Sequence, residues 1–156
     1  MTEKEIFEEL LSIIKTSDDD NGVVSSCLVR DGKIVAKGVS MSSGAHAEYL
    51  LLKSLEEIGI SITPTDVVYA TVEPCGKRTP GGNGEKMGDC TTNLINAGVK
   101  HIIYGASDPD ASGNTRYKFE SAGVLLEKTK SEEITLASIK AFNSTCKDQS
   151  HWLPLE

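Results

Sequence analysis

The chain has 156 residues, of which 38% are hydrophobic and 25% are charged, a balance typical of a globular domain with its own core. Its formal net charge of −7 argues against a nucleic-acid partner, because such binders need a basic surface to neutralise phosphates. Its apolar runs fall short of the roughly 20 residues that a transmembrane helix needs, and its glutamate-rich N-terminus does not resemble a signal or transit peptide. We therefore predict a single cytoplasmic domain over residues 1–156 with no membrane partner.

The start of the chain predicts a helix followed by a hairpin. Thr2 and Glu5 match a capping box that opens an amphipathic helix, expected over residues 2–16. Asp31-Gly32 is a two-residue turn signal for a β-hairpin. The strands of that hairpin are expected at residues 23–30 and 33–39.

The rest of the chain alternates between predicted helices and strands. The mostly apolar run 66–72 is typical of a central strand. A strand, a helix and a strand then follow one another, which implies parallel pairing with a right-handed crossover. The remaining expected elements are helices at 46–58, 90–97, 113–122 and 132–146, strands at 101–105 and 123–127, a glycine-rich loop at 76–89, and a tail at 151–156 that docks on the surface. We therefore predict a three-layer α/β/α domain whose five-stranded mixed sheet has its last two strands parallel.

Three short segments carry residues with metal chemistry, and they are His46-Ala47-Glu48, Glu73-Pro74-Cys75 and Cys90. One imidazole and two thiolates are ligands that Zn²⁺ accepts, and a catalytic zinc site keeps its fourth position for water. The metal would lower the pKa of that water and present hydroxide as the nucleophile. Glu48 is close to a ligand but is not needed as one, so it is the candidate to carry a proton from the water to a leaving amine. The sequence thus predicts Zn²⁺ held by His46, Cys75 and Cys90.

The predicted elements bring these residues to suitable places. His46 begins a helix whose entry turn can aim His46 and Glu48 into one pocket, Cys75 ends the central strand, and Cys90 begins the third helix. A thiolate at a helix N-terminus is also stabilised there. Taken singly, a histidine at a helix start is more often a cap, and a cysteine is more often a small buried residue. We interpret Cys27 and Cys146 as small buried residues of this kind.

The order of these motifs resembles a zinc deaminase signature, H-x-E followed by P-C-x-x-C. The first half is present, but 14 residues separate Cys75 from Cys90 where the signature has two. The strings HAE, VYATVEPC and CTTNLINAGVKHIIYGASDPD resemble the cytidine deaminase-like superfamily, and within it the deaminase domain of riboflavin biosynthesis. The resemblance runs from about Asn21 to Val124 and includes Arg78-Thr79-Pro80 and Asp108-Pro109. It implies the cytidine deaminase-like fold.

The resemblance further implies hydrolytic deamination of a diaminopyrimidine that carries a ribosylamino or ribitylamino phosphate. Asn21 and Ala47 would bind this substrate, with Asn21 on the base. Lys77 and Arg78 would meet the phosphate, since arginine pairs bidentately with phosphate oxygens. An equally good interpretation is that both are simply exposed charges in a loop. No reductase domain follows residue 156, so deamination alone is expected. A homodimer is expected by analogy.

Two other interpretations stay open. The first is a nucleotide, nucleoside or nucleobase deaminase, with an RNA editor disfavoured by the acidic charge. The second is a non-catalytic module stabilised by zinc. Glu48 argues against the module, because a structural zinc site has no use for that carboxylate and usually has a fourth protein ligand.

Overall fold

The computed structural model describes residues 1–78, 80–82, 84–110 and 113–156. Five strands form one mixed sheet in the order β2-β1-β3-β4-β5. β1 pairs antiparallel with β2 and β3, whereas β3 and β4, and β4 and β5, are parallel. The strands are β1 (Ser25–Arg30), β2 (Lys33–Val39), β3 (Val67–Val72), β4 (His101–Ala106) and β5 (Leu125–Lys128). The predicted mixed sheet with its last two strands parallel is confirmed.

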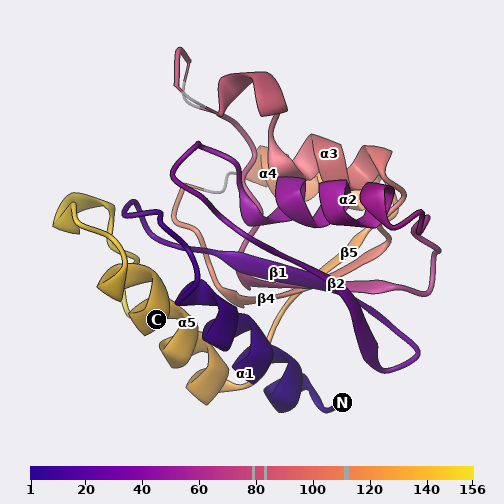
Figure 1. Ribbon diagram of the computed structural model, residues 1–156, viewed down its shortest axis with the longest axis horizontal. Coiled ribbons are helices and arrows are strands. Elements are labelled where there is room, and N and C mark those ends of the chain that lie inside the picture. Colours follow the sequence, from indigo (N-terminus) through magenta and orange to yellow (C-terminus); the bar gives the residue numbers. More distant parts are fainter. Residues whose placement is uncertain (79, 83, 111–112) are drawn as a thin grey trace.

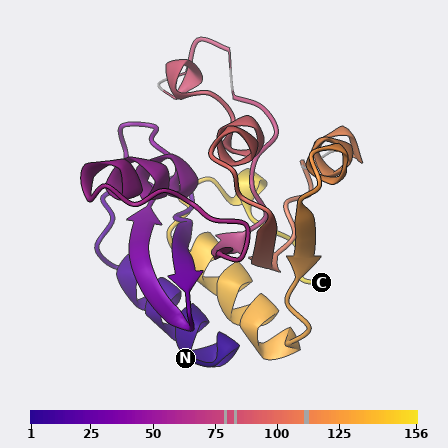
Figure 2. The ribbon, with the colours of Figure 1, turned by 90° about the vertical axis from the view of Figure 1, so that its right-hand side faces the viewer.

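Helices cover both faces of the sheet and make three layers (Figures 1 and 2). One face carries α1 (Glu3–Ile14) and α5 (Glu132–Ser144), and the other carries α2 (Ala47–Glu57), α3 (Cys90–Asn96) and α4 (Gly113–Ser121). Two short 3-10 helices, η1 (Glu85–Met87) and η2 (Gln149–His151), lie in the connecting segments. Within the described parts of the chain, every helix is too short or too polar to cross a membrane.

The ends of the elements follow their capping residues. Thr2 and Glu5 form the expected capping box, which makes Thr2 the N-cap, so α1 begins one residue later than predicted. Asp31 and Gly32 both have positive φ, 52° and 75°, as a type I′ hairpin turn requires. Gly123, at φ 74°, reverses the chain after α4 and delays β5 by two residues.

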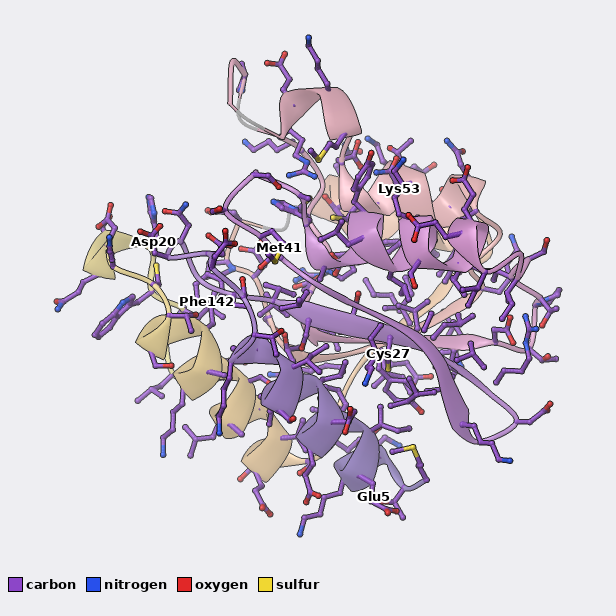
Figure 3. The ribbon with its side chains drawn as sticks, viewed as in Figure 1. Glu5, Asp20, Cys27, Met41, Lys53 and Phe142 are labelled. Atoms are coloured by element: carbon purple, nitrogen blue, oxygen red, sulfur yellow. The ribbon has the colours of Figure 1, made fainter. Side chains whose placement is uncertain are left out.

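The core has one layer on each face of the sheet, because successive side chains of a strand point to opposite faces. Along β1, Cys27 and Val29 pack with α1, while Leu28 packs with α2. The rings of Phe7 and Tyr69 meet edge to face with centroids 5.9 Å apart. In Figure 3 the Cys27 side chain lies on the sheet within this α1 layer.

Helix α2 approaches β2 closely because residue 38 is glycine. A Cβ at this position would lie 2.1 Å from the Ala47 carbonyl oxygen and 2.6 Å from the Leu51 nitrogen. These atoms belong to the backbone of α2, so no larger residue fits without moving the helix. Gly38 therefore sets where the first turn of α2 lies on the sheet.

Candidate active site

The three predicted metal ligands meet although they are far apart in the sequence. His46 is the N-cap of α2, Cys75 follows the end of β3 by three residues, and Cys90 is the first residue of α3. Their ligand atoms all lie within 4.8 Å of one another. The His46 Nδ1 atom is 3.4 Å from the Cys75 Sγ and 3.4 Å from the Cys90 Sγ. The structure thus forms the cluster that the sequence motifs predict.

The cluster fits a tetrahedral metal ion with nitrogen and sulfur ligands. Standard zinc–nitrogen and zinc–sulfur bonds place the two ligand atoms about 3.6 Å apart, close to the 3.4 Å found here. The His46 side chain makes no cap hydrogen bond to α2, so its Nδ1 is turned to the thiols. Cys90 is fully buried and Cys75 is half-buried, which limits access of water to the sulfur atoms.

The long cysteine loop closes through hydrogen bonds at the start of α3. The Cys90 backbone N–H donates to the Cys75 Sγ at 3.4 Å. The Thr91 N–H and hydroxyl both donate to the Cys75 carbonyl oxygen, at 3.0 and 2.8 Å. Asp89 caps the helix by accepting from the Thr92 N–H at 2.8 Å. These contacts hold the two thiols together despite the 14 residues between them.

The two thiols titrate as a pair. A hydrogen bond from the Cys90 thiol lowers the pKa of Cys75 to about 4. The pKa of Cys90 is raised by the same bond and by burial. The hydrogen bond between the two thiols thus shifts their pKa values in opposite directions.

Glu48 lies in the first turn of α2 and faces the same site. Its Oε2 atom accepts from the Cys90 Sγ at 3.4 Å, and the side chain is 3% exposed. Burial raises the pKa of Glu48, and the charge of His46 opposes this rise. A buried carboxylate with a raised pKa beside a metal-type site is suited to accept and return protons.

The site opens into a cleft of about 720 Å³. His46, Glu48 and Cys75 line it at one place. The other described lining residues are Asp19, Asn21, Gly22, Val24, Ser40, Met41, Ser42, Gly44, Val72, Glu73, Lys77, Arg78, Gly82, Gly84, Glu85, Asp108, Pro109, Asp110, Phe142, Ser150, His151, Trp152 and Leu153. Of the predicted substrate contacts, Asn21, Lys77 and Arg78 line the cleft. Ala47 is fully buried in the first turn of α2 and is not among the described lining residues, and its substrate contact stays a prediction.

Arg78 also ties two loops together. Its Nε donates to the Gly88 carbonyl at 2.7 Å, and its Nη1 donates to the Gly44 carbonyl at 3.0 Å, next to the start of α2. The buried Nη2 atom has no hydrogen-bond partner among the residues that the structure describes. Lys77 is exposed. Phosphate binding by this pair stays a prediction, and Thr79 of the same motif lies outside the described residues.

Sequence reasoning assigned no role to Glu73, which organises one wall of the cleft. Its buried carboxylate accepts from Arg116 of α4 at 3.1 and 3.3 Å, and from the Asp108 N–H at 3.1 Å. Asp108 lines the cleft, and burial raises the pKa of its carboxyl group. The position of Glu73 between an apolar strand and a ligand cysteine was the one sequence signal for its role. Its partner Arg116 could not be predicted, because it lies 43 residues away in the sequence.

Comparison with known families identifies the domain. The family model described as the cytidine and deoxycytidylate deaminase zinc-binding region matches residues 1–106. The chain belongs to this deaminase family. The match covers all three predicted ligands and Glu48.

Relatives of this family member include riboflavin biosynthesis proteins. The chain is 32% identical to the chloroplastic PYRD protein of Zea mays over 109 residues, which cover 67% of this chain and 25% of the relative. It is 29% identical to the RibD protein of Actinobacillus pleuropneumoniae over 132 residues, covering 80% of this chain and 32% of the relative. The chain thus spans between a quarter and a third of these relatives.

Solved structures share the fold. The Rib2 deaminase of Aspergillus oryzae matches with a TM-score of 0.70 at 20% identity, covering 96% of this chain and 94% of that one. The bifunctional deaminase–reductase of Thermotoga maritima matches with a TM-score of 0.66 at 23% identity, covering 94% and 40%. The dCMP deaminase of cyanophage S-TIM5 matches with a TM-score of 0.59 at 21% identity, covering 82% and 100%. The predicted cytidine deaminase-like fold is confirmed.

Proposed function

We propose that the protein is a zinc-dependent hydrolytic deaminase. Its substrate in this proposal is the diaminopyrimidine ribosylamino or ribitylamino phosphate of riboflavin biosynthesis, and ammonia is released. The observation that carries the activity is the buried Glu48 carboxylate, 3.4 Å from the Cys90 sulfur of a His/Cys/Cys cluster. The named riboflavin biosynthesis relatives support the choice of substrate. The cytoplasmic location and the homodimer stay predictions, and the plant relatives are named chloroplastic.

His46, Cys75 and Cys90 would hold the zinc ion. Two thiolates and a neutral imidazole would balance the charge of Zn²⁺, and two of these ligand residues, His46 and Cys75, line the cleft. When bound, the ion supplies Lewis-acid activation of a water molecule.

Glu48 moves the protons of the reaction. A water oxygen forms a bond to the ring carbon that carries the amino group, and the bond from this carbon to the amino nitrogen breaks. Glu48 accepts protons from the attacking water and returns them to the ring nitrogen and to the leaving amine. Water is consumed, ammonia leaves, and Glu48 ends in its starting state.

The size of the cleft supports a substrate larger than a single ring. Pockets of about 300–1,000 Å³ hold ligands of drug size, and this cleft has about 720 Å³. Lys77 and Arg78 are cationic residues that line it, so we place the phosphate there.

A panel of substrates tests the assignment. Purified zinc-loaded protein is incubated separately with the ribosylamino and ribitylamino pyrimidine phosphates, dCMP, cytidine and guanine, and ammonia release is followed. We expect release from one or both pyrimidine phosphates. The family description favours dCMP as the second candidate, and turnover of dCMP alone would replace the pathway assignment while leaving the chemistry in place.

Replacing Glu48 separates catalysis from metal binding. Because general acid–base groups contribute at least about 100-fold to rate, we expect Glu48→Gln to lower kcat by that factor or more. Zinc content by metal analysis and the unfolding midpoint should stay at wild-type values. Glu57→Gln, an exposed change on the same helix, is the matched control. Loss of zinc from the Glu48 variant would mean that Glu48 is a ligand, and the proposed role would be wrong.

A further inference from the structure

One wall of the cleft includes part of the C-terminal segment, defined here as residues 147–153. Ser150, His151, Trp152 and Leu153 line the cleft, and the neighbouring lining residues are Asp19, Asn21, Gly22, Val24 and Phe142 of α5. In Figure 3, Asp20 and Phe142 lie beside this segment, away from the start of α2. Neither the metal cluster nor the proton transfer uses these residues.

The C-terminal segment is fixed to α5 and to the loop after α1. The Asn143 side chain accepts from the Leu153 N–H at 2.8 Å and donates to the Leu153 carbonyl at 3.0 Å. The Lys147 N–H donates to the Asp20 carbonyl at 2.9 Å. Leu153 is 7% exposed and packs with Phe142. The wall therefore has a defined position before any ligand binds.

Trp152 presents an aromatic surface on this wall. Its indole N–H donates to the Cys146 carbonyl at 3.0 Å, which orients the ring. The side chain is nevertheless 44% exposed and lines the cleft. Since the N–H is already used, the free part of the ring offers only apolar and π contact. An exposed, oriented aromatic ring in a polar cleft is a typical ligand contact.

The charges of the cleft indicate which part of the substrate reaches Trp152. Among the described lining residues, the only lysine and arginine are Lys77 and Arg78, which are neighbours in one loop. The residues outside the described parts are Thr79, Asn83, Ala111 and Ser112, and none of these types is charged. The reacting ring must lie at Glu48, and the phosphate belongs at the cationic loop. The remaining part of the proposed substrate is its neutral sugar chain.

We propose that Trp152 is a specificity-determining residue whose exposed indole face contacts the sugar chain of the substrate. This inference rests on the proposed function. The contact adds affinity for substrates that carry the sugar and none for the bare ring, so the residue acts on KM rather than on kcat. Its effect is separate from zinc binding and from the protons that Glu48 moves.

Trp152 is the only tryptophan of the chain, so intrinsic fluorescence reports on this residue alone. Zinc-loaded Glu48→Gln protein is titrated with the ribosylamino pyrimidine phosphate, which it binds without turnover. The same heterocycle with a plain amino group in place of the sugar is the comparison ligand. Free tryptophan amide corrects for absorption by the ligands. We expect saturable quenching or a spectral shift with the sugar-bearing ligand and none with the bare heterocycle.

Kinetics give a second measurement that a purely structural role would not reproduce. We expect Trp152→Ala to raise KM for the sugar-bearing substrate about fivefold, the loss expected for one aromatic contact. KM for the bare heterocycle, kcat and zinc content should not change. Trp152→Phe keeps a ring and should stay near the wild-type KM. Leu155→Ala, at a neighbouring position that is 76% exposed, is the matched control.

The outcomes separate this inference from the proposed function. If the sugar-bearing pyrimidine is deaminated but neither the fluorescence nor the KM of Trp152→Ala responds, the role of Trp152 is wrong and the function stands. If dCMP alone is deaminated, and it alters Trp152 emission while cytosine does not, the sugar contact stands and the pathway assignment fails. Quenching by the bare heterocycle would place the ring on Trp152 and overturn the sugar contact.

Discussion

Two buried carboxylates in this site have different surroundings and therefore different roles. Glu73 is held by a guanidinium group and a backbone N–H, which fix its position. Burial raises the pKa of Glu48, which faces the cleft and the metal cluster. The first is a positioning residue for the Asp108 wall, and the second is the group proposed to move protons.

The Glu73 ion pair should contribute measurably to stability. In Arg116→Met the buried carboxylate keeps the Asp108 N–H but loses both guanidinium bonds. Hydrogen bonds to charged groups contribute about 1.5–3 kcal/mol. Because the Arg116 side chain is 51% exposed and screened by solvent, we expect the free energy of unfolding, measured with urea, to fall by about 1–2 kcal/mol. Lys118→Met, an exposed change on the same helix, should cost much less.

A second substitution tests the cause of that loss. Adding Glu73→Gln to the Arg116→Met protein replaces the unpaired buried charge with a neutral amide, so part of the lost stability should return. If the double variant is less stable than Arg116→Met by the full cost of Glu73→Gln alone, the two side chains are not coupled and the ion pair has no structural role.

At the residue scale, contiguous motifs could be predicted and distant partners could not. His46, Glu48 and Cys75 lie in two short strings whose chemistry is visible in the sequence. The two carbonyl contacts of Arg78 and the pairing of Glu73 with Arg116 depend on how loops cross in space. Periodicity and motif spacing carry no information on such crossings, so both roles emerged only from the structure.

At the scale of elements, the contact between β2 and α2 determines where His46 and Glu48 lie. Gly38→Ala would place a methyl group 2.1 Å from the Ala47 carbonyl oxygen, and α2 would have to shift. Overpacking of this kind costs about 1–3 kcal/mol. Because the shifted turn carries a metal ligand and the proton-transfer group, we expect weaker zinc affinity and lower kcat together with lower stability. Competition with a chelator, urea unfolding and ammonia release measure the three effects.

Gly59→Ala is the control for this change. Residue 59 follows the far end of α2 at φ 75°, and a methyl group added there would meet nothing within 4 Å. The substitution costs about 1–2 kcal/mol through its left-handed backbone but leaves the start of α2 in place. Zinc affinity should therefore stay normal in Gly59→Ala. An equal loss of affinity in both variants would show that general destabilisation, and not displacement of α2, weakens the site.

Element types were predictable because each has a clear periodicity, while their ends depended on local caps. The turn at Asp31-Gly32 and the cap at Thr2 are short-range features and were predicted from the sequence. The last helix ends at Ser144, two residues earlier than expected. There the chain turns so that Cys146 can bridge to Asn21 and the C-terminal segment can reach the cleft. That long-range contact has no signal in the local pattern.

At the scale of the whole molecule, the topology explains how a metal site tolerates an unusual cysteine spacing. α3 begins close to the carboxyl end of β3, so Cys75 and Cys90 meet across the 14-residue loop between them. The loop is free to shape the cleft, and Lys77 and Arg78 lie on its wall. The sulfur positions are set by the fold, while the loop between them is available for specificity.

The separation of core and metal site predicts how the protein responds to loss of zinc. The two large hydrophobic clusters contain none of the ligands, so the protein should stay folded when a chelator is added. A ligand that binds only the folded state adds about 4 kcal/mol at a thousandfold excess over its Kd. We therefore expect far-UV circular dichroism to be retained while the unfolding midpoint falls, and zinc to restore it.

Thiol labelling shows whether the metal was held by the predicted cysteines. After chelation the half-buried Cys75 should react rapidly with a thiol reagent, because its sulfur is no longer covered by a metal. Cys27 should stay unreactive, since it is 0% exposed and burial raises the pKa of its thiol to about 12. Peptide mapping by mass spectrometry identifies the labelled residue. If the protein unfolds on chelation, the zinc is structural. If Cys75 is labelled equally with and without zinc, Cys75 is not a ligand.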